Sequence, residues 1–178
     1  MTKKLPRIAP FFLLLLSVSA QNTATSWDDW KFLLGEWTAG ESSGAPGQAS
    51  KGGFTLSPDL GGQVLVRRNH AEYPAAGGRP AMVHDDLMIV YHVPSGVGKF
   101  ATKAFYDDNE GHAIHYDVNF SPDKKKIIFL SEPSPGAPQY RLTYEDVQTG
   151  TAKVRFEIAP PAKPGEFATY VEATVHRK

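Results

Sequence analysis

Hydrophobic and polar residues alternate along most of the chain after residue 35. The alternation is clearest in the second half, where Ile114, Tyr116 and Val118 are separated by the polar residues His115 and Asp117. A period of two places one face of a strand on a core and the other in water, which is typical of an antiparallel sheet. The pattern predicts strands at 36–39, 53–56, 64–73, 86–93, 100–107, 112–120, 126–131, 139–146, 151–158 and 167–177.

Short turn-like segments separate these strands. Stretches such as PAAGGRP at 74–80 and DDNEG at 107–111 combine Gly, Pro, Asn and Asp, which form tight turns. Because no long helix intervenes, consecutive strands are expected to pair antiparallel. We predict an all-β fold, a closed antiparallel ten-stranded up-and-down barrel, since closure leaves no unpaired edge. Side chains fill a barrel of about eight strands, so this wider one is expected to contain a cavity.

A short N-terminal helix is expected before the first strand. Ser26 is a suitable N-cap, and Asp28 falls in the first turn, where a carboxylate favours the helix dipole. Trp30 and Leu33 then recur at helical spacing, and Trp37 follows four residues later. We expect this segment to plug one end of the barrel, with Trp37 closing that end.

The first 20 residues have the layout of a secretory signal peptide. Lys3, Lys4 and Arg7 form a basic start, and the apolar run Ile8–Leu16 leads to small residues ending at Ala20. The apolar run is shorter than the about 20 residues that span a bilayer. We expect cleavage after Ala20, with an uncleaved anchor as the alternative. A short linker at 21–25 and a single barrel domain at 26–178 would follow, in an exported protein that is periplasmic or secreted.

The net charge bears on the kind of partner, and the cysteine content bears on the source of stability. Without its first 20 residues the chain would hold 16 Lys and Arg against 19 Asp and Glu, a net charge of −3. That balance argues against nucleic acid as a partner, because such binding needs clustered positive charge. The chain contains no cysteine, so its stability is expected to come from burial and sheet closure rather than from disulfides. The composition does not indicate which oligomeric state the protein adopts.

Five of the seven tyrosines fall on faces that the alternation predicts to be inward, namely Tyr91, Tyr106, Tyr116, Tyr140 and Tyr144. A buried phenol needs a hydrogen-bond partner, and several together indicate a pocket for an amphipathic ligand. His112 would stand at the mouth of this pocket, and the alternative is a solvent-exposed histidine at a strand end. The predicted ligand-binding residues are Trp37, His112, Tyr116, Tyr140 and Tyr144. The alternative for the tyrosines is a filled core.

The sequence fits neither a metal site nor an esterase elbow. His84 and His92 would share a face, but eight residues of strand separate them by about 26 Å, too far to hold one ion. The segment Gly40–Gly44 matches the G-x-S-x-G pattern of esterases, which works only on a strand-turn-helix elbow that an all-β chain lacks. We therefore predict no metal site and no catalytic residue, and we expect a binding protein rather than an enzyme.

Three short motifs resemble those of nitrobindin-type barrels, which are relatives of lipocalins and fatty-acid-binding proteins. They are GEWTAGES at 35–42, Gly61-Gly62 before Val64, and the final strand YVEATVHRK at 170–178. The chain is more similar still to a set of exported bacterial proteins of unknown function with the same barrel. The resemblance covers roughly residues 30–178. It implies the same barrel fold.

The resemblance also implies a possible haem cofactor. Nitrobindins hold haem through a histidine early in the last strand, a position that falls here on Thr169 or Tyr170. His176 lies several residues later. A tyrosinate can bind haem iron, so Tyr170 is the haem-binding candidate, although alternation points it outward.

The leading hypothesis is an exported barrel that binds a small, largely apolar or amphipathic molecule in its interior without catalysis. One alternative, implied by the resemblance alone, is haem-dependent handling of nitric oxide or peroxynitrite. The other is a packed barrel with a structural or partner-binding role in the envelope.

Overall fold

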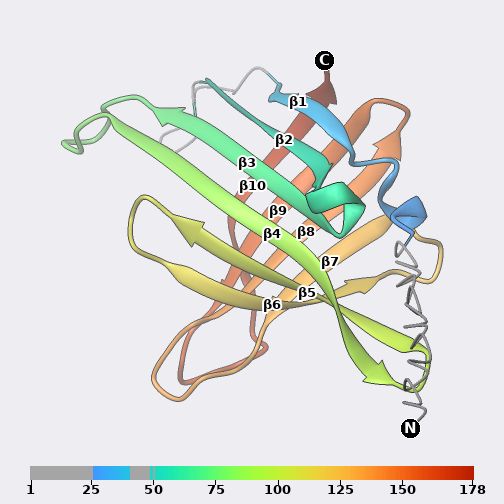
Figure 1. Cartoon of the computed structure of the whole chain (residues 1–178). Coiled ribbons are helices and arrows are strands. Elements are labelled where there is room, and N and C mark those ends of the chain that lie inside the picture. The colour runs from blue at the N-terminus through green and yellow to red at the C-terminus, as the bar shows by residue number, and fades with distance from the viewer. Residues whose placement is uncertain (1–25, 41–48, 50) are drawn as a thin grey trace, which may run out of the picture.

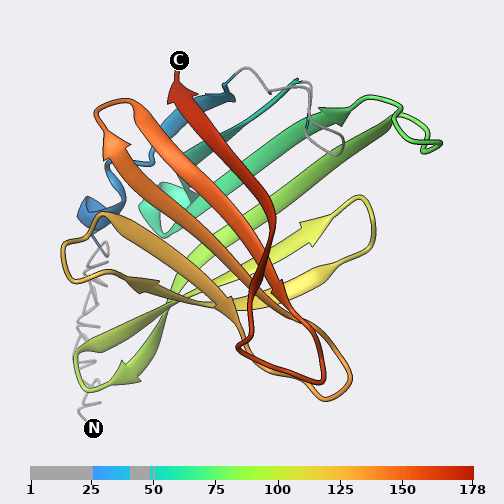
Figure 2. The same cartoon turned by 180° about the vertical axis from the view of Figure 1, so that it is seen from behind.

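The computed structural model describes residues 26–40, 49 and 51–178, and this part of the chain forms a closed antiparallel barrel (Figure 1, Figure 2). Each strand pairs with its neighbours in sequence, and the last strand closes the barrel on the first. The all-β, ten-stranded up-and-down barrel is therefore confirmed. The predicted signal peptide and linker, and most of the Gly40–Gly44 segment, lie outside the described residues.

The strands are β1 (Gly35–Ala39), β2 (Lys51–Asp59), β3 (Val64–Tyr73), β4 (Met82–Gly96), β5 (Lys99–Asp108), β6 (Ala113–Phe120), β7 (Lys126–Ser131), β8 (Gln139–Gln148), β9 (Thr151–Ala159) and β10 (Ala168–Arg177). Two single turns of 3₁₀-helix, η1 (Asp28–Trp30) and η2 (Leu60–Gly62), precede β1 and β3. The bounds of β3 and β7 are those the sequence predicts, whereas β4 extends well beyond the predicted 86–93 at both ends.

The expected N-terminal helix is not confirmed, because the described residues form only the 3₁₀ turn η1 there. Ser26 is not the N-cap residue, although its Oγ accepts a hydrogen bond from the Asp28 backbone N–H at 3.2 Å. Trp30 and Leu33 are 2% and 1% exposed. Burial of these two side chains holds the segment against the barrel, so tertiary packing outweighs the local helical spacing.

Tryptophan side chains close one end of the barrel. The Trp30 ring lies edge-on to Phe120 and Phe129, with centroids 5.6 and 5.9 Å away. Trp27 stacks on His92 at 4.3 Å, and its Nε1 donates a hydrogen bond to the Gly62 carbonyl at 2.8 Å. The predicted plug is therefore present, built from a 3₁₀ turn, and we call this side the plugged end.

Arg177, near the C-terminus, binds the segment that precedes β1. The Arg177 guanidinium donates hydrogen bonds to the carbonyls of Leu34 and Phe32, the latter at 2.7 Å, and lies 4.7 Å from the centre of the Trp37 ring. On the other side of β1, Gly53 of β2 lies directly against the Trp37 carbonyl, where any Cβ atom would collide with backbone. The short strand β1 is thus held from both sides.

The opposite end of the barrel is open to solvent on its inner face. Along the inward positions of β4, exposure rises from 0% at Val90 to 9% at Asp86 and 43% at Met82. On β8, Tyr144 is completely buried, whereas Tyr140 is only half-buried. We call this side the open end. The fully described turns at this end are 74–81, 109–112, 132–138 and 160–167.

Candidate functional site

A buried ion pair lies in the barrel interior where the plugged half meets the open half. Arg67 of β3 and Asp86 of β4 are 7% and 9% exposed, and the guanidinium donates a hydrogen bond to the carboxylate. The guanidinium also lies 5.2 Å from the Phe54 ring centre and 5.9 Å from that of Tyr144. Burial alone would lower the pKa of Arg67, but nearby charge, led by Asp86, leaves it raised, so Arg67 is a buried cation.

His84 extends this pair towards the open end. Its Nε2 lies 3.3 Å from Asp86 Oδ2, and its Nδ1 lies 2.7 Å from Glu110 Oε1. The hydrogen bond to Asp86 is the largest cause that raises the pKa of His84 to about 9; burial opposes the rise and Glu110 adds to it. His84 is therefore protonated at neutral pH and is shared between two carboxylates.

A second branch of the network reaches the rim. The Tyr106 hydroxyl lies 3.2 Å from His84 Nε2 and donates a hydrogen bond to Asp108 Oδ2 at 3.0 Å. His112 Nδ1 lies 2.9 Å from the same Asp108 oxygen, and the His112 side chain is 55% exposed. Burial would raise the pKa of Asp108, but hydrogen bonds led by those from His112 leave it lowered. His112, which lies at the rim of the open end, thus fixes the position of the Asp108 carboxylate.

The predicted tyrosines occupy two levels of the interior. Tyr116 and Tyr144 are 2% and 0% exposed, and their pKa values are raised chiefly by burial, that of Tyr144 to about 12. Both lie close enough to Arg67 for its charge to oppose that rise. Tyr140 lies further towards the open end, stacked on Phe156 at 5.9 Å. The structure therefore brings Tyr116 and Tyr144 together beside the ion pair and places Tyr140 nearer the open end.

Trp37 is 2% exposed and packs against Phe54 at 6.0 Å, on the plugged side of the ion pair. It is thus apart from the solvent-accessible half of the interior. The inward assignment of Tyr91 is wrong, because its neighbour Val90 is the fully buried, inward residue and Tyr91 pairs with Lys103 on the outer face. The centre of β4 is apolar on both faces, so alternation there carries no information about direction.

The outward assignment of Tyr170 is also wrong. A β-bulge between Thr169 and Val171 shifts the register of β10 against β9, so that two residues oppose Phe156. The Tyr170 ring consequently lies edge-on to Phe156, with centroids 6.2 Å apart, and is 70% exposed at the open end. An unpaired residue of this kind reverses the direction that simple alternation predicts.

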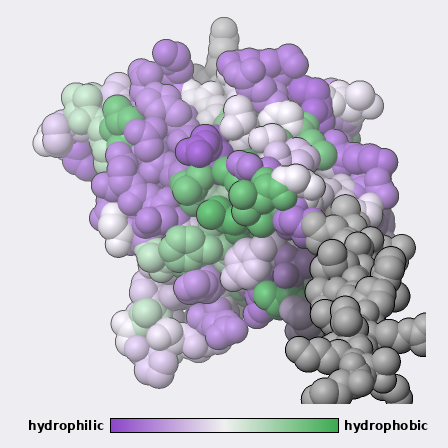
Figure 3. All heavy atoms as spheres, viewed as in Figure 1, coloured by the Kyte–Doolittle hydropathy of each residue, from purple (hydrophilic) through white to green (hydrophobic). Residues whose placement is uncertain are grey.

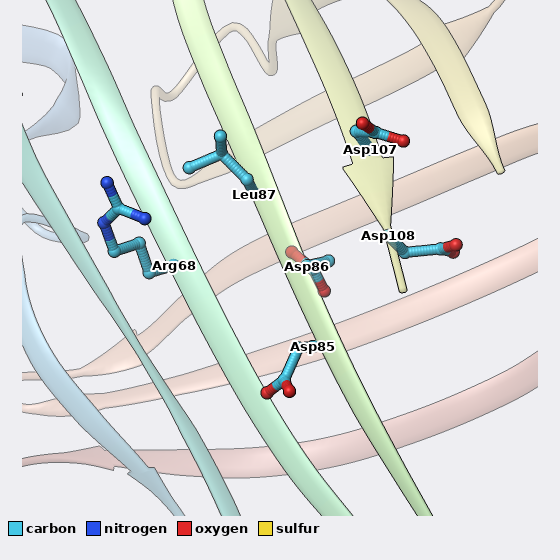
Figure 4. Close-up of a pocket in the computed structure, with 6 residues that line it drawn as sticks. All are labelled: Arg68, Asp85, Asp86, Leu87, Asp107 and Asp108. Carbon is cyan, nitrogen blue, oxygen red and sulfur yellow. The ribbon is translucent and has the colours of Figure 1, made fainter. Parts of the chain in front are cut away.

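Two pockets flank the network. One of about 250 Å³ crosses β3, β4 and β5 and is lined by Arg68, Asp85, Asp86, Leu87, Asp107 and Asp108 (Figure 4). The other, of about 230 Å³, lies at the open end and is lined by Glu72, Tyr73, Pro74, Ala81, Met82 and Val83. Despite four aspartates in the first pocket, no group of three or more His, Asp or Glu side chains in the described ranges is arranged to hold a metal ion.

The face of the molecule seen in Figure 3 is mostly hydrophilic, with a hydrophobic area near its centre. None of the described helical segments is both long and apolar enough to cross a membrane. No protein-family model matches the chain, and no curated protein matches it. The barrel is compatible with a calycin-like fold, while the likeness to nitrobindins has no family match behind it.

Sequence reasoning missed the charged core of the site: Arg67, Asp86 and His84. A usable signal was present, because counting in steps of two from the apolar residues Leu65 and Met88 reaches Arg67 and Asp86 on the inner face. Charged residues in strands normally indicate a solvated face, so the charges of these residues argued against an inward position.

Proposed function

We propose that this protein is a non-catalytic binding protein that holds a small amphipathic molecule in the open half of its barrel. The observation that carries the proposal is the rise in exposure of inward side chains towards the open end. This open half ends at the buried ion pair of Arg67 and Asp86, which we call the floor of the barrel. A barrel packed solid would bury its inward side chains along the whole length of each strand. Small-molecule sites combine apolar walls with few polar groups, and this half of the interior has both.

Apolar and aromatic side chains supply the walls for such a ligand. Tyr140, Phe156, Val171 and Ala173 are half-buried on β8, β9 and β10, and their faces continue the buried core. The polar contacts would come from the ion-pair floor and from the hydroxyls of Tyr116 and Tyr144. In this arrangement Trp37 supports the floor from the plugged side and does not touch the ligand.

Haem fits these residues poorly. Tyr170, the candidate ligand of the iron, is 70% exposed at the rim, and its ring contact is the edge of Phe156. The interior histidine nearest that end, His84, already bonds Asp86 and Glu110. We therefore derive no haem-dependent step for this protein.

The test is binding of a neutral apolar fluorophore, N-phenyl-1-naphthylamine, to the protein and to two tryptophan variants of β10. Ala173 points inward and pairs with Val154, so Ala173→Trp should fill the open half and abolish the fluorescence rise. Thr174 is exposed on the outer face, and Thr174→Trp should bind the probe like the original protein. Thermal unfolding checks that both variants fold. Equal binding by both folded variants would refute an interior site.

We also propose that the protein is exported, on the basis of its first 20 residues. Mass spectrometry of the protein isolated from the periplasm or the medium should give a chain that begins at Gln21. An intact Met1 on that material would contradict cleavage.

A further inference from the structure

Two polar atoms in the floor of the barrel are buried without a hydrogen-bond partner: Arg67 Nε and the Tyr144 hydroxyl. Their residues are 7% and 0% exposed. The guanidinium lies 5.9 Å from the centre of the Tyr144 ring, so both atoms belong to one locality. Buried polar groups are nearly always paired in native proteins, and two unpaired groups in one locality, each able to donate a hydrogen bond, indicate a place for an acceptor.

Negative charge already outnumbers positive charge around this locality. Arg67 bonds Asp86, and His84 contacts both Asp86 and Glu110. Asp108 adds a third carboxylate, so two interior cations face three carboxylates, with His112 at the rim beside Asp108. A ligand carboxylate or phosphate would add another negative charge next to Asp86 without a free cation to receive it. Burial of an unbalanced charge is strongly unfavourable.

We propose that the barrel selects a neutral amphipathic molecule with a carbonyl oxygen at its buried end. That oxygen accepts hydrogen bonds from Arg67 Nε–H and from the Tyr144 hydroxyl, which matches the two acceptor positions of a carbonyl group. The apolar tail runs along Tyr140 and Phe156 towards the open end. This inference deepens the proposed binding function and rests on it.

The ligand class is tested by displacement of N-phenyl-1-naphthylamine with three molecules of matched chain length: 2-decanone, decanoate and decane. The ketone should displace the probe at about tenfold lower concentration than either of the others, the size of effect expected from one to two buried hydrogen bonds. Decanoate carries the same oxygen chemistry with an added charge, and decane has the tail alone. The comparison therefore separates acceptor recognition from charge and from apolar contact.

Two variants assign the preference to these atoms. Tyr144→Phe removes a hydroxyl that has no partner, so the barrel should fold normally while the advantage of 2-decanone over decane falls about threefold or more. Tyr91→Phe makes the same change on the outer face and should leave the advantage intact. Arg67→Lys keeps the charge that Asp86 needs but lacks Nε, and it should also reduce the advantage.

The results separate the proposed carbonyl acceptor site from the proposed binding of a ligand inside the barrel. If decanoate displaces the probe more tightly than the ketone, the neutral-carbonyl inference is overturned while barrel binding stands. Equal displacement by all three molecules, or an unchanged ketone advantage in Tyr144→Phe, overturns the acceptor site in the same way. A probe that fails to bind at all removes the proposed function and this inference with it.

Discussion

The buried ion pair gives the sharpest energetic prediction. Arg67→Met and Asp86→Leu each remove one charge and leave the other in the barrel interior, where both side chains are less than a tenth exposed. Breaking a buried pair in this way costs about 3–5 kcal/mol, because the remaining charge is uncompensated. Replacing both partners by apolar residues of similar volume is neutral or stabilising, so the double variant should recover most of the loss.

The neighbours of the pair predict which single change costs more. After Arg67→Met, Asp86 keeps His84 at 3.3 Å, and the cost should lie near 3 kcal/mol. After Asp86→Leu, Arg67 has no carboxylate partner and faces only the rings of Phe54 and Tyr144, so the cost should lie near 5 kcal/mol. The free energy of unfolding should therefore fall in the order original protein, Arg67→Met, Asp86→Leu.

Urea unfolding followed by tryptophan fluorescence at neutral pH measures these values, because the tryptophans of the plugged end report loss of the core. Lys126 and Glu145 form the matched exposed pair across β7 and β8 at 3.1 Å, and Lys126→Met should cost less than about 1 kcal/mol. A loss below about 1 kcal/mol for either buried single variant, or the reverse order of the two, would refute the reasoning.

Three further predictions follow from individual contacts. Gly53→Ala should lower the free energy of unfolding by about 2 kcal/mol or more in urea unfolding, because its Cβ would collide with the Trp37 carbonyl; an unchanged midpoint would contradict the close approach. Arg177→Ala should cost about 2 kcal/mol through its two backbone hydrogen bonds, whereas Lys178→Ala next to it should cost less than about 0.5 kcal/mol in the same assay. Because the pKa of His84 is raised from 6.5 to about 9 on folding, its stabilisation is fully present below pH 6.5 and is lost as pH rises to about 9. The loss should amount to at most about 3 kcal/mol, and it should be absent in His84→Gln when unfolding is measured across that range.

The local pattern of the chain predicted the barrel because each strand carries its own evidence. Alternation in β6 separates Ile114 and Tyr116, which are 8% and 2% exposed, from the polar residues between them. Turn residues mark where each strand ends, and short links force neighbouring strands to pair antiparallel. Closure then follows from the need to cover two edges, which is a property of the whole meander rather than of any one residue.

Local reasoning failed where a longer-range contact decides direction or shape. The N-terminal segment has helical spacing, but burial of Trp30 and Leu33 against the barrel limits it to a 3₁₀ turn. Tyr91 lies in a strand that is apolar on both faces, and Tyr170 lies on a bulge that exists only in the pairing of β10 with β9. These features depend on what lies opposite each residue, which the sequence of one strand does not contain.

The sequence by itself determined the strands, their faces in the later half, and the closed barrel, because alternation and turn chemistry act within a few residues. The tertiary structure alone decided that Arg67, Asp86 and His84 meet inside that barrel, beside Tyr144. The strand period places the adjacent residues Arg67 and Arg68 on opposite faces of β3, and the register of β3 against β4 then brings Arg67 next to Asp86. A charge becomes an interior site through the partners that surround it. Here those partners come from the consecutive strands β3 and β4 and, in Tyr144, from the distant strand β8.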